Sequence, residues 1–352
     1  KSSLFLFLII ATDVSSQLVS IPNTIIINTL VYLLKIFYAT KINRLVVMNY
    51  ASKKIIVGSR ESPLAKEQVE IFLKVLERKF GNSYLNFVEK KFVRTSGDKF
   101  LDKKISEIGN KGLFTKEIDE AQLRSEIDIA VHSLKDLPTE LPKGLFIGGV
   151  LKRERPHDVI FTLKNFNIKN NTNKILLGTS SIRRKIQLMN INPNLKIMEI
   201  RGNVGTRIEK VKNGHFDGIV LAEAGLRRLK IRNNFKPIDI RNIIPAVGQG
   251  VIALVIKKNK FIENIVNKIN HKTTFIESDC ERNFLRALDG SCKTPIGALA
   301  KIVKKNKKTS ILFRYMASSL DGKKLVKSKT FFELSNYKSM SFSLGKKIKK
   351  VI

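Results

Sequence analysis

The stretch LFTKEIDEAQLRSE (113–126) is followed directly by IDIAVHSL (127–134), and this pair decides the fold. The first segment spaces its apolar residues as an amphipathic helix requires, and the second is a short apolar run typical of a buried strand. Upstream, KIIVG (54–58) and NFVEKKFV (86–93) predict two more strands with a helix between them. This β-α-β-α-β order predicts a largely parallel sheet with helices on both faces.

A similar series recurs further along the chain. KILLGTS (174–180), LKIMEIRGNVGTR (195–207) and FDGIVLAEAGLRRL (216–229) each predict a strand that leads into a helix. GVIALVIKK (250–258) is interpreted as a strand that returns to the first domain. From about Thr273 a helix precedes three alternating segments, which predict an antiparallel sheet. We therefore expect an α/β protein with two similar domains of mostly parallel sheets, plus a smaller α+β C-terminal domain.

The first 47 residues differ from the rest of the chain. Their apolar runs, LFLFLIIA (4–11) and IIINTLVYLLKIFY (25–38), are too short or too interrupted for a membrane-spanning helix. We expect the folded protein to start near Met48, with a targeting leader and a membrane anchor as open alternatives. The expected parts are a non-core leader or extension (1–47), a first domain (48–151 plus 250–270), a second domain (152–249) and a third domain (271–352).

Composition narrows the class of protein. The 352 residues are 43% hydrophobic, so the chain can bury more than one core. A net charge of +35 is compatible with nucleic-acid binding, but the lysines are scattered singly and in pairs, which favours a solvated surface. Two cysteines cannot form a disulfide framework and fit a reducing compartment. The cysteines and the four histidines show no metal-ligand spacing, so we expect no metal site.

Arginine and hydroxyl side chains gather where predicted strands end. They lie in GSRESPLA (58–65), AVHSLKDLP (130–138), GTSSIRRK (178–185), RGNVGTR (201–207) and GLRRL (225–229). Helix N-termini bind anions, and arginine adds forked donors suited to carboxylates. Arg183 and Arg184 stand in a first helical turn, where the helix dipole opposes positive charge, so each is unfavourable there without an anionic partner. The alternative, that these arginines pair with surface acids or with solvent, stays open. The expected ligand carries several negative charges.

One acid, Asp136, stands among these cations. Its carboxylate can accept a proton or stabilise a developing cation. The alternative, that Asp136 only pairs with Lys135 or caps a turn, stays open at this point. His132 has no visible Ser/Asp relay in the sequence and is expected to be structural.

Eight motifs occur in a fixed order along the chain: GSRESPLA, GNKGLFTKEI, DIAVHSLKDLP, GTSSIRRK, RGNVGTR, LAEAGLRRL, IPAVGQG and LDGSCKTPIGALA. This order resembles the hydroxymethylbilane synthase family, also called porphobilinogen deaminase, from about Ile55 to Ala300. The resemblance implies two domains like those of periplasmic binding proteins and a C-terminal domain that carries a cofactor cysteine. It also implies a transferase of tetrapyrrole biosynthesis that joins four porphobilinogen molecules head to tail. Ammonia is released at each addition, and hydrolysis then frees hydroxymethylbilane.

The resemblance also implies roles for individual residues. One dipyrromethane cofactor per chain is attached through a thioether to Cys292, and Asp136 is the catalytic aspartate. The residues implied to hold cofactor carboxylates are Ser133, Lys135, Ser181, Arg183, Arg184 and Arg207. Those implied to bind substrate or the growing chain are Arg60, Ser62, Arg201 and Arg228. Asp98, Lys111 and Phe114 are implied in or beside a mobile loop over the cleft, and Gln249 in the interdomain segment.

Some residues depart from the family pattern or lie outside it. His157 stands where many members have arginine, and Glu107 where some have a basic residue. Cys280 falls outside the family's motif and is interpreted as a packing or surface thiol.

The expected partners are porphobilinogen and, for the product, uroporphyrinogen-III synthase. We expect a cytoplasmic monomer whose core binds no nucleic acid and no membrane, or an organelle-targeted protein if residues 1–47 are a leader. A periplasmic-type solute-binding protein for a polycarboxylate is the alternative, but Cys292 and Asp136 would then have no function. A nucleic-acid-binding protein is a third possibility, and no recognisable nucleic-acid-binding module in the sequence supports it.

Overall fold

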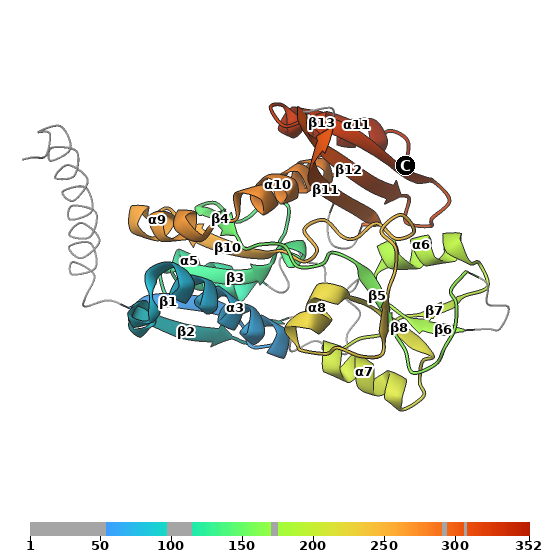
Figure 1. The fold of residues 1–352 in the computed structure, drawn as a ribbon, viewed down its shortest axis with the longest axis horizontal. Helices are drawn as coiled ribbons and strands as arrows, with labels where there is room; N and C mark the ends of the chain where they lie inside the picture. The colour runs from blue at the N-terminus through green and yellow to red at the C-terminus, as the bar shows by residue number, and fades with distance from the viewer. Residues whose placement is uncertain (1–53, 97–114, 170–174, 291–293, 306–307) are drawn as a thin grey trace, which may run out of the picture. The chain divides into compact units, whose positions relative to one another are not determined.

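A computed structural model describes residues 54–96, 115–169, 175–290, 294–305 and 308–352, of which Ile55–Ile352 form one compact unit (Figure 1). The first sheet has the strand order β2-β1-β3-β10-β4. Its strands are β1 (Ile55–Arg60), β2 (Val88–Val93), β3 (Ile129–Ser133), β4 (Leu145–Val150) and β10 (Ile252–Lys257). Strand β1 runs parallel to β2 and β3, whereas β10 is antiparallel to both of its neighbours.

Both faces of this sheet are covered. Helices α3 (Pro63–Phe80) and α9 (Lys260–Ile269) pack on one face and α5 (Lys116–Leu123) on the other. Strand β10 is buried from Ile252 to Ile256 because its alternate side chains enter the two cores. A continuous apolar run is what a strand with two covered faces requires. Two short 3₁₀ helices, η1 (Asn82–Phe87) and η2 (Leu134–Asp136), complete this region.

The second sheet repeats this arrangement, with strand order β7-β6-β8-β5-β9. Its strands are β5 (Asp158–Phe161), β6 (Leu176–Gly178), β7 (Lys196–Met198), β8 (Gly218–Ala222) and β9 (Phe235–Pro237). Its helices are α6 (Ile182–Ile191), α7 (Val204–Lys212) and α8 (Glu223–Arg228). Strand β6 is parallel to β7 and β8, and β5 is antiparallel to β8 and β9. Each large sheet is therefore mixed, where the sequence predicted mostly parallel sheets.

The third sheet is antiparallel, as predicted. It consists of β11 (Ile296–Lys305), β12 (Lys308–Ser318) and β13 (Leu325–Glu333). Helices α10 (Lys272–Ala287) and α11 (Tyr337–Lys349) pack against it around an aromatic cluster of Phe284, Phe313, Tyr315 and Phe332. The α/β class with a small α+β region is thus confirmed by the strand pairings.

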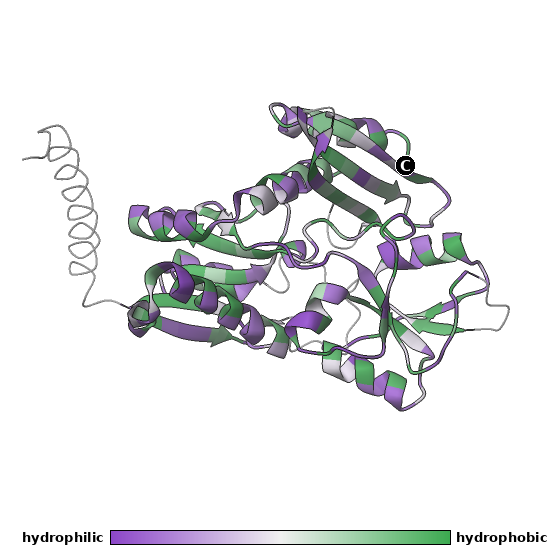
Figure 2. Ribbon diagram, in the orientation of Figure 1, coloured by the Kyte–Doolittle hydropathy of each residue, from purple (hydrophilic) through white to green (hydrophobic). Residues whose placement is uncertain are grey.

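Hydrophobic residues concentrate on the strands, and the helices carry hydrophilic residues as well (Figure 2). Among the residues that the structure describes, no helix combines the length and apolarity needed to cross a membrane. The expected leader, residues 1–47, lies outside the described residues. The domain boundaries after residues 151, 249 and 270 stay predictions.

Candidate active site

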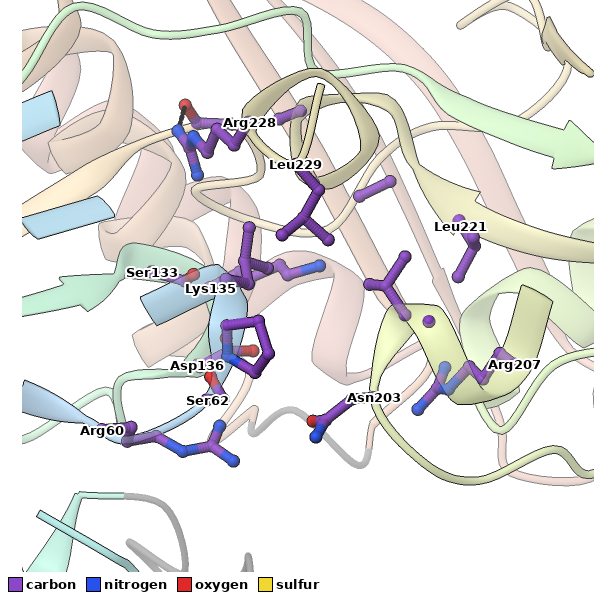
Figure 3. Close-up of a pocket in the computed structure, with 18 of the residues that line it drawn as sticks. Arg60, Ser62, Ser133, Lys135, Asp136, Asn203, Arg207, Leu221, Arg228 and Leu229 are labelled. Atoms are coloured by element: carbon purple, nitrogen blue, oxygen red, sulfur yellow. Dashed lines mark hydrogen bonds between the residues drawn. The ribbon is translucent and has the colours of Figure 1, made fainter. Parts of the chain in front are cut away.

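A cavity of about 230 Å³ lies where strands of the first and second sheets end. Eight of the predicted site residues line it: Arg60, Ser62, Ser133, Lys135, Asp136, Arg184, Arg207 and Arg228. Figure 3 shows Lys135 reaching into the space between Arg60 and Ser62 on one side and Asn203 and Arg207 on the other. A site at the carboxyl ends of parallel strands is the usual position for a ligand in an α/β protein.

The first wall is built by the ends of β1 and β3. Arg60 is the last residue of β1, and Ser62 is the N-cap of α3, where its side chain accepts a hydrogen bond from the Ala65 amide. Ser133 ends β3, and its hydroxyl accepts a hydrogen bond from Gln68 Nε2 at 2.7 Å. These caps and hydrogen bonds hold the strand ends so that their polar side chains face the cavity.

The 3₁₀ turn η2 follows β3 and carries Lys135 and Asp136. Burial lowers the pKa of Lys135 to about 8, an effect that the Asp136 carboxylate partly offsets and the Arg184 guanidinium strengthens. No salt bridge joins Asp136 to Lys135 in the described part of the chain. The Asp136 carboxylate is exposed and lines the cavity, so it is available to a ligand.

The opposite wall comes from the RGNVGTR turn and from α8. Gly202 has a φ of 107°, a conformation that L side chains rarely adopt, and its carbonyl accepts a hydrogen bond from Arg207 Nε at 2.7 Å. The buried Arg228 donates from Nη2 to the Gly250 carbonyl at 2.7 Å (Figure 3). Burial lowers the pKa of Arg207 and of Arg228 to about 10 each, and for Arg207 the nearby Arg184 and Arg201 add to the effect.

The charge of the lining fits a polyanionic ligand. Five cationic side chains and one acidic side chain line the cavity. Because burial and mutual repulsion both disfavour the charged forms of Lys135 and Arg207, a bound anion would relieve an unfavourable arrangement. A cofactor that carries several carboxylates therefore matches the donors present, whereas a cationic or purely apolar group does not.

Arg183 and Arg184 have an anionic partner within the chain, which sequence reasoning missed. Asp158, the first residue of β5, is fully buried and accepts hydrogen bonds from Arg183 Nη1 at 2.8 Å and from Arg184 Nε and Nη2 at 3.0 and 2.7 Å. Burial alone would raise the pKa of Asp158, but the two guanidinium groups hold it well below its usual range. A charged residue that opens the apolar run DVIF was the one sequence signal for this site.

The same carboxylate ties together segments that are distant in sequence. Gln249 Nε2 donates to Asp158 Oδ1 at 3.0 Å and to the Pro156 carbonyl at 2.7 Å. Arg183 also donates to the Ile244 carbonyl at 2.7 Å. The segment that enters the second sheet and the segment that leaves it are thus joined through one acid.

Several predicted residues do not line the cavity. Arg183 is directed to Asp158 and Ile244, and Ser181 is the N-cap of α6, where its hydroxyl accepts from the Arg184 amide at 3.5 Å. Arg201 pairs with Glu199 at 2.6 Å. Cys292 lies outside the described residues, as do Asp98, Lys111, Phe114 and Glu107 of the predicted loop.

Three further residues from the sequence analysis have defined positions. His132 is buried in β3, and the structural role expected for it stays a prediction. His157 Nδ1 lies 3.5 Å from the buried carboxylate of Glu223. Cys280 is fully buried in α10, and burial raises the pKa of its thiol. It is therefore a packing thiol, one of the two alternatives that the sequence left open.

Fold and cavity together define a class of protein: an α/β protein that binds a polycarboxylate at the ends of its strands. Comparison with known proteins gives the family. The family model described as "Porphobilinogen deaminase, dipyromethane cofactor binding domain" matches residues 55–263. The model described as "Porphobilinogen deaminase, C-terminal domain" matches residues 275–352. The chain belongs to the porphobilinogen deaminase family.

Two relatives of similar length, both named porphobilinogen deaminase, support this membership. The porphobilinogen deaminase of Nitratiruptor sp. is 40% identical over 295 residues, which cover 83% of this chain and 92% of the relative. That of Syntrophomonas wolfei is 42% identical over 271 residues, covering 76% and 86% respectively. Among solved structures, the periplasmic VFT2 domain of Bordetella pertussis BvgS is 15% identical with a TM-score of 0.37, covering 64% of this chain and 89% of that domain.

The predicted enzyme class is therefore confirmed. The chain is a transferase of tetrapyrrole biosynthesis whose larger part is a dipyrromethane cofactor-binding domain. The alternative of a solute-binding protein is not favoured.

Proposed function

We propose that the 230 Å³ cavity is where this chain joins porphobilinogen units head to tail, with Asp136 as the catalytic carboxylate. The observation that carries this proposal is one exposed carboxylate in a lining that otherwise carries five cations. The dipyrromethane group supplies, when bound, the primer pyrrole to which porphobilinogen is added. The side chains of the cavity bind carboxylates, orient the reacting rings and stabilise charge.

Asp136 suits a reaction that develops positive charge. When the aminomethyl group of porphobilinogen loses ammonia, the remaining pyrrole becomes cationic, and a fixed carboxylate stabilises that charge electrostatically. The same oxygens can accept a pyrrole N–H and, at the attacking carbon, the proton that leaves. The position of Asp136 in the short turn η2, directly after β3, supports a fixed orientation of its carboxylate.

The cations divide between primer and substrate. We assign Ser133, Lys135, Arg184 and Arg207 to the carboxylates of the primer, and Arg60, Ser62 and Arg228 to those of the incoming substrate. Arg201 lies close enough to Arg207 to lower its pKa, so we assign it to the growing chain at the edge of the cavity.

Two residues first expected at the cofactor are assigned supporting roles. Ser181 caps the helix that carries Arg184, and Arg183 shares Asp158 with Arg184. Neither needs to touch a ligand to affect its binding, because both determine where the Arg184 guanidinium lies.

We assign the thioether to Cys292 from its motif, since the cysteine itself lies outside the described residues. The test is the intact mass of the purified protein, which should exceed the sequence mass by one dipyrromethane. Cys292→Ser should lose the added mass, and Cys280→Ser, the matched control at a buried thiol, should keep it. An active protein that carries no added mass would refute the assignment.

We further propose that the chain acts as a cytoplasmic monomer and passes its product to uroporphyrinogen-III synthase. A product with a reactive hydroxymethyl group needs a prompt consumer, which supports the hand-off. Size-exclusion chromatography with light scattering tests the oligomeric state, and a coupled assay with the synthase tests the transfer. A stable dimer at micromolar concentration would contradict the monomer.

A further inference from the structure

A second, smaller cavity of about 50 Å³ adjoins the first. Arg60, Ser62, Leu64, Ser133 and Asp136 line both of them. The smaller cavity is also lined by polar residues that the larger one does not reach: Ser59, Gln68, Thr115 and His132. The Asp136 carboxylate thus stands at the junction of the two spaces.

The buried end of this cavity contains an unsatisfied polar group. His132 is 5% exposed, and its Nε2 has no hydrogen-bond partner among the described residues. Thr115 is 1% exposed, and its hydroxyl faces the buried Asp119 carboxylate without a hydrogen bond of good geometry among the described residues. Leaving a buried polar atom unpaired costs about 1–3 kcal/mol, so such atoms normally have a partner, often a bound water.

The chemistry of the lining indicates which partner fits. Burial, with the Arg60 charge as a smaller cause, lowers the pKa of His132 to about 4, so the imidazole is neutral near pH 7. A neutral ring beside an arginine gives no reason for a cation such as ammonium to bind. A neutral molecule that both donates and accepts hydrogen bonds fits, and a cavity of more than about 15 Å³ can hold a water.

We propose that this cavity holds the water molecule that releases the finished product, with His132 and Thr115 as its positioning residues. The inference rests on the function proposed above, in which Asp136 is the catalytic carboxylate. Held between His132 and Asp136, the water can enter the larger cavity past a carboxylate able to accept its proton, the one acidic side chain among the described residues that line either cavity.

The hydrolytic step balances without a further reactant. The water oxygen forms a bond to the methylene carbon at the end of the product, and the bond from that carbon to the primer breaks. The electron pair of the broken bond stays with the primer ring carbon, which takes up a proton. The water gives one proton to Asp136, and Asp136 passes a proton to that ring carbon, so that one molecule of water is consumed, the carboxylate is restored and no redox change occurs.

The test separates product release from chain growth. His132→Leu and Thr115→Val in the primer-loaded protein remove the two polar groups at nearly constant volume. Thr162→Val, at a buried threonine that lines neither cavity, is the matched control. After rapid mixing with porphobilinogen and acid quenching, intact mass gives the fraction of protein that carries each number of added units.

We expect the fully extended species to accumulate about tenfold in both cavity variants, the effect of losing roughly one hydrogen bond to a reacting group, and not in the control. Equal slowing of every addition would instead indicate a role in ammonia release or in folding and would overturn the inference. If His132→Leu does not fold, Thr115→Val alone decides.

A readout independent of activity is a high-resolution crystal structure of the primer-loaded protein. Ordered density within hydrogen-bonding distance of His132 Nε2 supports the inference, and its loss in His132→Leu supports it further. A smaller cavity that contains no ordered density overturns the inference. Primer-loaded variants that release product normally refute only the water site, whereas wild-type protein without primer mass refutes the function on which the site rests.

Discussion

Asp158→Asn provides the sharpest test of how the cavity is held together. The substitution keeps the shape of the side chain and removes its charge. Four hydrogen bonds of 2.7 to 3.0 Å reach the carboxylate, from Arg183, Arg184 and Gln249, and the side chain is fully buried. The variant therefore leaves two buried guanidinium groups without their shared counter-charge. Breaking a buried ion pair by removing one partner costs about 3–5 kcal/mol.

Asp158→Asn should weaken ligand binding even in the protein that remains folded. Arg184 lines the cavity, and two of its three guanidinium nitrogens donate to Asp158, so its position depends on that carboxylate. We expect primer loading, read from intact mass, to fall at least fivefold at a temperature where circular dichroism shows the variant folded. In the loaded fraction, KM for porphobilinogen should rise more than kcat falls, because a positioning residue acts through binding.

The pH dependence of stability gives an independent check. The folded-state pKa of Asp158 is depressed, so its contribution is present above the unfolded-state pKa and is lost as pH falls towards the folded-state value. The difference in unfolding free energy between wild type and Asp158→Asn should thus be constant from neutral pH down to about pH 4, the ordinary aspartate pKa, and shrink below it. Asp217→Asn, which removes a carboxylate of the same domain that lines neither cavity, is the control. Normal primer loading in Asp158→Asn, or equal loss in Asp217→Asn, would refute the reasoning.

Three further outcomes are expected. Asp136→Asn should bind porphobilinogen but slow single turnover by at least about 100-fold, since electrostatic stabilisation is lost; a near-normal rate would remove Asp136 from the mechanism. Because the pKa of Lys135 is about 8, calorimetric affinity of primer-free protein for citrate should fall as pH rises through 8, and Lys135→Arg should flatten the profile. A wild-type affinity for citrate that does not change with pH would contradict the assignment of Lys135 to ligand carboxylates. Cys280→Ala should keep primer mass and activity while the unfolding free energy falls by about 1 kcal/mol, measured in urea, because the thiol only packs.

Local patterns predicted the elements that are buried on two faces. The apolar runs of β3 and β10 are continuous because helices cover both sides of their sheet, and such runs are visible in sequence. Strands β4, β5 and β9 were missed: β5 and β9 have four and three residues, and β4 includes two glycines. Strand direction was also out of reach for β10 and β5, since pairing between distant segments determines it.

The lining of the cavity was predictable for a similar reason. Residues that follow parallel strands meet at one edge of a sheet, so Arg60, Ser133 and Lys135 could be grouped from their positions alone. Their pairing could not be predicted. Whether an arginine faces a ligand or an internal acid depends on contacts between segments far apart in sequence, as for Arg183 and Asp158.

Of three fully buried acids in the described residues, one offsets part of the positive charge of the cavity before its ligand is bound. Asp158, Glu223 and Glu281 are fully buried, and each pairs with arginine, Glu223 with Arg227 and Glu281 with Arg153. A cleft for a polyanion would otherwise accumulate repulsion in the protein that has yet to acquire its primer. Only Asp158 pairs with an arginine that lines the cavity. Neutralising Glu223 or Glu281 should therefore lower stability and leave primer loading intact, whereas neutralising Asp158 should lower both.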